Sequence, residues 1–347
     1  MLPSYEETLA ALRIPEVELK QLQQVHKRKL RTAINWFWIS AVITIAVCFI
    51  VYGVAESDGL WPILTLVLSL FCLIRIFSVH AANKRAYRLD YKHKVVGPLA
   101  DTMLKLAKLP HETRDYEKYC DYAPEAFIDR AWISKSELFV TDIDDITGED
   151  LFTGKYGLTE FQFSELKMTR KETTTDTDGN STTTNVKVFD GVLFAADFKK
   201  HFSGLTVINT KVIKRDTGIG KLVSKFINAA VSTANKRANQ KIELENVEFN
   251  HHFIVQTTNE IEARYILSSV LMEQILSFVN QHPHPLVISF HDSYMFIAVY
   301  SSKNFFDDGI GKSTPNGEYN LQGIYNDLSI FFRIIEEFDL NTRIWNK

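Results

Sequence analysis

LTEFQFSELKMT at 158–169 and TNVKVFDGVLFAADF at 184–198 are the stretches that decide the fold of this chain. Both are rich in aromatic and β-branched residues, and apolar side chains alternate with polar ones along much of each run. The segment between them, KETTTDTDGNSTTTN at 171–185, contains no apolar residue. The pattern predicts an antiparallel hairpin whose polar tip projects from the core.

Further strand-like runs follow this hairpin toward the C-terminus, and segments with helical periodicity separate them. The runs are GLTVIN at 204–209, FIVQT at 253–257, PLVISFH at 285–291 and YMFIAVYSS at 294–302, the last two joined through Asp292 and Ser293. The helical segments predicted from apolar spacing are 219–234, 259–279 and 319–338. The fold class predicted for this region is α+β, with an antiparallel sheet and two to three long helices.

Two apolar stretches stand near the N-terminus. They are AINWFWISAVITIAVCFIVYGVA at 33–55 and LWPILTLVLSLFCLIRIFSVHAA at 60–82, and only the second contains a charged residue, Arg75. As a helix, each stretch is long enough to cross a hydrocarbon core of ~30 Å. The pattern predicts an N-terminal transmembrane helical hairpin, in which the Arg75 side chain extends to the membrane interface.

Charged residues around this predicted hairpin give it an orientation. Lysines and arginines flank both outer ends, whereas the connecting residues 56–59 carry only acids. By the positive-inside rule both termini are expected in the cytoplasm, with two spans in the membrane. The predicted domains are a cytoplasmic N-terminal segment (1–32), the transmembrane hairpin (33–82), a helical neck (83–121) and a cytoplasmic α+β domain (122–347).

Four motifs in this order resemble those of a known family. They are FTGKYG at 152–157, TEFQFSEL at 159–166, FDGVLFAADFKKHFSGLT at 189–206 and EARYILSSVLME at 262–273. Together they resemble the bacterial two-span membrane proteins grouped as domain of unknown function 3137. The resemblance implies a location in the bacterial inner membrane and this domain organisation, and it supplies no catalytic residues.

A strongly basic segment at 211–241 surrounds the predicted helix 219–234, whose apolar residues recur on one face. The simpler interpretation is a helix that packs on the sheet with a solvated polar face. The alternative is a surface for anionic lipid or a partner. A nucleic-acid site is not expected, because aromatic residues are not interleaved with the cations. The candidate surface residues are Lys214, Arg215, Lys221, Lys225, Lys236 and Arg237.

Catalytic and metal signals are weak. The net charge is −3, and the three cysteines lie far apart, so no disulfide framework or cysteine-based zinc site is expected. The GIGKS sequence at 309–313 resembles the end of a phosphate-binding loop, but Pro315 and Gly317 oppose a helix directly after it. Five histidines could include metal ligands, although no HExxH motif accompanies them: His251, His252, His282, His284 and His291.

The sequence therefore predicts a membrane-anchored binding or scaffolding module that engages a protein partner, a second copy of itself or an anionic lipid surface. No catalytic residue, metal or cofactor is assigned to it, and an enzymatic activity is not expected. Two alternatives stay open at this point. One is a membrane-tethered metal-dependent enzyme that uses the histidines, and the other is a subunit of a small membrane transport assembly.

Overall fold

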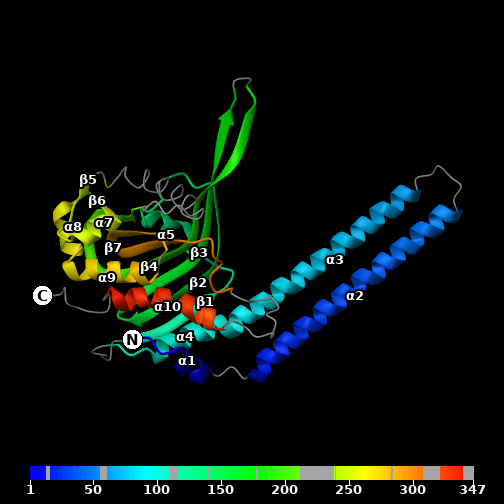
Figure 1. Ribbon diagram of the computed structural model, residues 1–347, viewed down its shortest axis with the longest axis horizontal. Coiled ribbons are helices and arrows are strands. Elements are labelled where there is room, and N and C mark those ends of the chain that lie inside the picture. Colours follow the sequence, from blue (N-terminus) through cyan, green and yellow to red (C-terminus); the bar gives the residue numbers. More distant parts are fainter. Residues whose placement is uncertain are drawn as a thin grey trace. The chain divides into compact units, whose positions relative to one another are not determined.

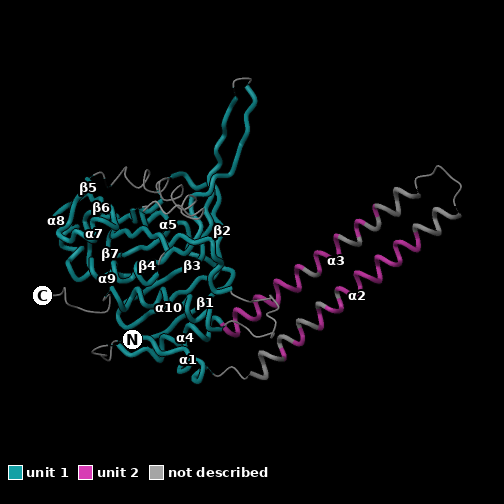
Figure 2. The backbone as a smooth tube through the Cα atoms, in the orientation of Figure 1, with its two compact units in different colours: residues 1–12, 96–308, 319–347 teal, residues 13–95, 309–318 magenta. Residues whose placement is uncertain are grey.

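The computed structural model describes residues 1–12, 16–54, 61–109, 116–139, 141–176, 179–211, 238, 240–282, 284–307 and 321–338. The chain forms two compact units (Figure 2). Unit 1 comprises residues 1–12, 96–308 and 319–347, and unit 2 comprises residues 13–95 and 309–318.

An antiparallel sheet of seven strands dominates unit 1 (Figure 1). Its strand order is β1-β2-β3-β4-β6-β5, and β7 also pairs with β4. The strands are β1 (Glu117–Ala123), β2 (Asp145–Gly157), β3 (Thr159–Thr175), β4 (Ser181–Thr210), β5 (Gln240–Ile242), β6 (Phe253–Thr257) and β7 (Leu286–Tyr300). The prediction of an α+β domain with an antiparallel sheet is correct for this unit.

The hairpin predicted from the two opening stretches is formed by β3 and β4. Phe163 pairs with Phe194 near its base, and Thr175 pairs with Ser181 near its tip. The tip is closed by Asp176, whose carboxylate accepts a hydrogen bond from the backbone N–H of Asn180 at 2.9 Å. Figure 1 shows the end of this hairpin projecting from the sheet, as its polar composition predicts.

Two pairs of predicted strands are single long strands in the structure. GLTVIN continues β4, and PLVISFH and YMFIAVYSS are both parts of β7, so the prediction of separate strands is wrong. The apolar alternation breaks where β4 and β7 lose register, between Asp197 and Thr206. Lys199 and Asp292 have positive φ values of 56° and 55° there. These irregular residues interrupt the pattern but not the strand.

The two faces of the sheet have different covers. On one face, Leu193, Phe296 and Ala298 pack in a core with Ile133 of the short helix α5 (Arg130–Lys135). On the opposite face, the ring of Phe163 stacks on that of Phe331 in helix α10 (Leu321–Glu337), with 4.9 Å between centroids. The helix predicted at 319–338 is therefore confirmed as a cover of the aromatic core.

The helix predicted at 259–279 is two shorter helices, so the prediction of one long helix is wrong. Leu267 leaves helical geometry with ψ 61°, and the Ser268 hydroxyl caps the next helix by accepting a hydrogen bond from the backbone N–H of Leu271. The helix predicted at 219–234 lies outside the described residues. The remaining helices of unit 1 are α1 (Tyr5–Ala11), α4 (Gly97–Leu106), α7 (Val247–His252), α8 (Glu260–Ile266) and α9 (Ser269–Gln281).

Unit 2 contains two long helices that contact each other, α2 (Glu16–Val54) and α3 (Trp61–Tyr91), and the π-helical turn η1 (Lys92–Val96) begins in it. None of the helices in the described part of the chain has both the length and the apolar character that crossing a membrane requires. The predicted transmembrane hairpin is therefore wrong. The multi-pass topology and the inner-membrane location with both termini cytoplasmic are wrong for the same reason.

The two helices extend beyond the apolar stretches from which the membrane hairpin was predicted. The prediction rests on the apolar stretches alone, whereas α2 begins at Glu16 and α3 ends at Tyr91. Each helix thus includes a charged segment as well as the apolar stretch. Arg75, predicted as a polar residue within the membrane, is an exposed residue of α3.

Candidate functional site

A cleft of about 380 Å³ lies on one face of the sheet in unit 1. Strands β1, β2, β3, β4 and β7 contribute to it, and α5 contributes one side chain. The described residues of the lining combine aromatic rings with carboxylates and include no histidine, cysteine or lysine. The lining residues are Tyr119, Asp121, Trp132, Thr153, Gly154, Glu160, Phe161, Gln162, Ala195, Asp197 and Tyr294.

The register of the sheet explains why these residues meet. Residues directly opposite each other on neighbouring strands place their side chains on the same face. In one row Tyr119 of β1 pairs with Lys155 of β2, and Lys155 pairs with Glu160 of β3. The cleft is therefore an ordered part of one sheet face.

A second row of paired residues lies next to the first, two residues away along each strand. Asp121 of β1 pairs with Thr153 of β2, and Thr153 pairs with Gln162 of β3. Gln162 pairs with Ala195 of β4, which pairs with Phe296 of β7. Small and polar side chains in the middle of this row leave the space that the cleft occupies.

Helix α5 places Trp132 at the cleft. Its first turn is capped by Asp129, whose carboxylate accepts hydrogen bonds from the backbone N–H groups of Ala131 and Trp132 at 2.7 and 3.2 Å. The Trp132 ring then meets the ring of Tyr294 edge to face, with 4.9 Å between centroids. Burial of Ile133 in the core fixes the helix on the sheet. The indole therefore has a defined position at the cleft.

The aromatic surface already receives a cation from the chain itself. The ammonium of Lys135 lies 4.2 Å from the centroid of the Tyr294 ring and 5.5 Å from that of Trp132. The same ammonium pairs with the Asp292 carboxylate at 3.4 Å. An aromatic ring and a carboxylate thus hold one lysine at this end of the cleft.

The carboxylates of the cleft differ in their partners. Asp197 pairs with Lys199 at 2.7 Å. Asp121 and Glu160 are exposed and form no ion pair with another described residue. Lys155, between them in the sheet, pairs instead with Glu117 at 3.0 Å, and this hydrogen bond raises the pKa of the lysine. The cleft therefore presents two carboxylates that can receive a cation, Asp121 on β1 and Glu160 on β3.

Gly154 allows the strands beneath the cleft to approach closely. A Cβ atom at this position would lie 2.2 Å from the backbone oxygen of Tyr119 and 3.0 Å from the ring of Phe161. Neither neighbour is the free end of a flexible chain, so a larger residue would push β1 away from β2. The glycine thus protects the geometry of the cleft.

A separate cluster of carboxylates could hold a metal ion. The side chains of Glu149, Asp150 and Glu165 have oxygen atoms within 4.8 Å of one another, and the last two are buried. Tyr122 donates a hydrogen bond to Asp150, and burial, followed by the charge of Asp150, raises the pKa of its phenol. Oxygen ligands of this kind suit hard cations such as Mg²⁺ or Ca²⁺.

The predicted histidine ligands do not form a group of three metal-ligating side chains in the described part of the chain. The one group of three metal-ligating side chains found there contains no histidine. The ring of His282 packs against Phe278 and that of His284 against Phe305. Burial lowers the pKa of both imidazoles. These contacts are those of histidines packed at the edge of the core.

The other sequence candidates have mixed outcomes. Arg75 lines a pocket in unit 2 between α2 and α3. The predicted basic surface and the GIGKS segment lie outside the described residues, so the structure tests neither. That surface consists of Lys214, Arg215, Lys221, Lys225, Lys236 and Arg237.

Sequence reasoning missed the cleft itself. The alternation in β1 places Tyr119 and Asp121 on one face, a signal present in the segment EKYCDYA at 117–123. Their neighbours Trp132 and Tyr294 come from distant parts of the chain. Only the pairing of the strands shows that these four residues share a site.

The fold and this cleft define the class of the protein as an α+β protein with a partly open sheet face. Comparison with known families adds one match, in which the model of a family described as protein of unknown function (DUF3137) covers residues 187–340. The motif-based resemblance is thus confirmed for this part of the chain, which includes most of β4 and all of β7 and α10. No curated protein matches the chain.

One solved structure matches this chain in the comparison. It is the crystal structure of the mycobacterial trehalose monomycolate transport factor A, TtfA, which is 12% identical in sequence with a TM-score of 0.30. The similarity covers 64% of this chain and 86% of that chain. At this level it assigns no function.

Proposed function

We propose that unit 1 is a binding module that takes a lysine or arginine side chain of a protein partner into the cleft on its sheet. The observation that supports this most directly is the pairing of aromatic and acidic side chains in adjacent rows. Tyr119 and Asp121 lie on the same face of β1, and the row of Tyr119 continues through Lys155 of β2 to Glu160 of β3. A cation there would meet both a ring and a carboxylate.

The energies of such contacts suit reversible binding. A cation over an aromatic ring contributes about 0.5–2 kcal/mol, and a hydrogen bond to a charged group contributes about 1.5–3 kcal/mol. The Tyr119 side chain is accessible, since the residue is 41% exposed. The position of Lys135 over Tyr294 shows the same kind of contact within the chain.

The lining favours binding over catalysis. A nucleophilic mechanism needs a serine, threonine or cysteine next to a general base. Among the described lining residues, Thr153 is the only hydroxyl of that kind, and it stands opposite Gln162. The described lining also includes no histidine that could act as its base. Its aromatic rings and carboxylates suit recognition of charge and of apolar surface.

Titration of the full chain with tetra-arginine by isothermal calorimetry tests this proposal. The variant Asp121→Asn/Glu160→Gln should weaken binding at least about tenfold, because it removes two charge-assisted contacts. The matched control is Glu248→Gln/Glu273→Gln, which removes two exposed carboxylates elsewhere on unit 1. The control should bind tetra-arginine within about twofold of the unchanged protein.

A second comparison separates recognition of a cation from simple attraction between net charges. Tetralysine should bind, whereas tetralysine with acetylated side chains should not, since acetylation removes the charge and the cation–π contact. The variant Tyr119→Ala should also weaken binding without a change of net charge. Equal affinity for the acetylated peptide, or an equal loss in the control variant, would contradict the proposal.

A further inference from the structure

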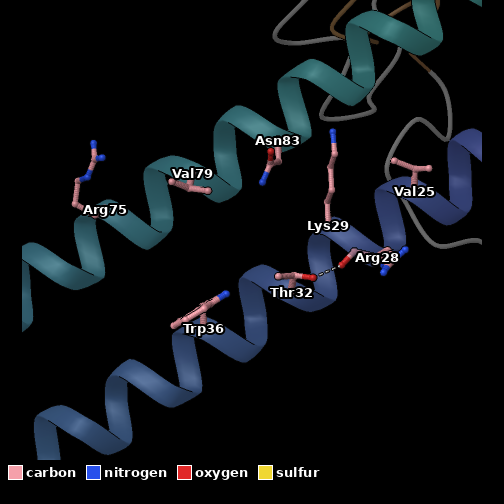
Figure 3. A pocket seen from close by; sticks show the side chains of 8 residues that line it. All are labelled: Val25, Arg28, Lys29, Thr32, Trp36, Arg75, Val79 and Asn83. Atoms are coloured by element: carbon pink, nitrogen blue, oxygen red, sulfur yellow. Dashed lines mark hydrogen bonds between the residues drawn. The ribbon is translucent and has the colours of Figure 1, made fainter.

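A pocket of about 600 Å³ lies between α2 and α3, within unit 2 (Figure 3). Its volume is within the range of small-molecule sites, roughly 300–1,000 Å³. The lining combines cations with apolar side chains and two neutral polar groups. These residues are Val25, Arg28, Lys29, Thr32, Trp36, Arg75, Val79 and Asn83.

Helical spacing explains why these side chains share one space. On α3, Arg75, Val79 and Asn83 follow one another at intervals of four residues and so lie on one face. On α2, positions 25, 28, 29, 32 and 36 fall on one face in the same way. Figure 3 shows Lys29 and Asn83 extending into the space between the helices from opposite sides.

The charge of the lining has one sign. Arg28, Lys29 and Arg75 contribute three cations, and the lining residues that the structure describes include no carboxylate. The sequence of α2 contains no acid after Glu18, and that of α3 contains none before Asp90. Among the described residues no carboxylate forms an ion pair with any of the three cations. The electrostatic complement of this pocket is therefore an anion.

Apolar surface lies beside these cations. Trp36 is 63% exposed, and Val25 and Val79 are also about half exposed. The neighbouring polar group of Thr32 is satisfied locally, because its hydroxyl donates to the carbonyl oxygen of Arg28 at 2.9 Å. A small inorganic ion would leave the tryptophan and the valines in water.

We propose that this pocket binds an amphiphilic organic anion, with its head group at Lys29 and its apolar body against Trp36 and Val79. Lys29 extends into the space between the helices (Figure 3), and the positive charges of Arg28 and Arg75 in the lining further favour an anionic head group such as a carboxylate or a phosphate. The apolar body supplies the contact area that charge alone does not. This site is separate in unit and in chemistry from the acidic cleft of unit 1.

Isothermal calorimetry of the full chain with laurate and with dodecyl phosphate, each below its micelle concentration, tests the proposal. Both anions should bind, and their relative affinity identifies the preferred head group. Dodecyltrimethylammonium carries the same tail with a positive head, and sodium sulfate carries charge without a tail. Neither should bind, since each lacks one of the two required parts.

Matched variants place the binding in this pocket. Lys29→Gln/Arg75→Gln should weaken binding of the better anion at least about tenfold, as expected for the loss of charged contacts. Arg31→Gln/Lys84→Gln removes two cations from the same helices outside the lining and should change the affinity by less than about twofold. Circular dichroism checks that both variants keep their helices.

Several outcomes would overturn this inference. They are absence of binding by both anions, equal binding of the cationic amphiphile, and equal losses in the two variant pairs. If Lys29→Gln/Arg75→Gln loses its helical signal, the proposal is tested instead by the salt dependence of binding to the unchanged protein. Binding that depends on these exposed cations must weaken as the sodium chloride concentration is raised. Salt-independent binding would also refute the proposal.

Discussion

Lys200 shows how one residue acquires unusual chemistry from its surroundings. Its ammonium lies 4.3 Å from the centroid of the Tyr265 ring and 5.8 Å from that of Phe198. Loss of hydration beside these rings lowers the pKa of Lys200 from 10.5 to about 8. Because the unfolded chain binds the proton more tightly between these two values, the contribution of this residue to stability rises with pH across that window.

We predict that the buried amine of Lys200 titrates near pH 8. At pH 8 a pKa of about 8 leaves about half of the Lys200 amine neutral. NMR titration of ¹³C-labelled lysine side chains, with the signal assigned through Lys200→Arg, should place the midpoint of Lys200 near 8 rather than near 10.5. A midpoint near the ordinary value of about 10.4 would show that the pKa of Lys200 is not lowered.

At the scale of elements, α5 links the core of the sheet to the cleft. The helix is short, so its capping residue Asp129 has a large share in holding Trp132 in place. We predict that Asp129→Ala lowers the stability of unit 1 by about 1 kcal/mol. Thermal unfolding should register a decrease of a few degrees in the melting temperature.

The same variant should affect binding as well as stability. If Trp132 loses its position against Tyr294, tetra-arginine should bind more weakly to Asp129→Ala. Asp142→Ala is the matched control, because it removes an exposed carboxylate from the segment between α5 and β2. Identical behaviour of the two variants in melting temperature and in affinity would rule out the capping role.

Comparison of the predicted helices and strands with the observed ones shows which features can be inferred from the sequence. The hairpin of β3 and β4 is predictable because alternation and a polar turn are local signals. The continuity of β4 through Phe202 is not, since the strand loses register there and the alternation is broken. Likewise, the interruption at Leu267 depends on one backbone conformation within an apolar stretch that otherwise has helical spacing.

The cleft is a property of non-local pairing. Tyr119 and Asp121 can be placed on one face from their own strand, but their distance from Trp132 and Tyr294 cannot be inferred from spacing. The pocket in unit 2 was equally hidden, although Arg75, Val79 and Asn83 have the spacing of one helix face. Its partner face on α2 becomes known only once the two helices are seen in contact.

At the scale of the whole molecule, unit 1 joins segments from both ends of the sequence. Residues 1–12 belong to the same unit as α10. The Tyr325 hydroxyl of α10 donates a hydrogen bond to the backbone oxygen of Pro3 at 2.5 Å, and its ring meets that of Tyr5 with 5.6 Å between centroids. The N-terminal segment is thus part of the folded unit.

We predict that Tyr325→Phe destabilises unit 1 by about 1 kcal/mol, because a buried hydrogen bond to Pro3 is lost. Urea denaturation should show a lower midpoint with an unchanged slope. Tyr119→Phe, which removes an exposed hydroxyl in the cleft, is the control and should leave the midpoint in place. A midpoint for Tyr325→Phe equal to that of the control would show that the Pro3 contact does not stabilise the fold.

The projecting end of the hairpin has a consequence for solubility. Its strands extend beyond their neighbours, and such edges can template pairing with other chains. Thr173 faces Thr183 across the strands, and Thr175 faces Ser181, with hydroxyl oxygens 3.0 and 2.9 Å apart. Because this ribbon has no apolar side chain to form a dry interface, it can stand in water without seeding fibrils.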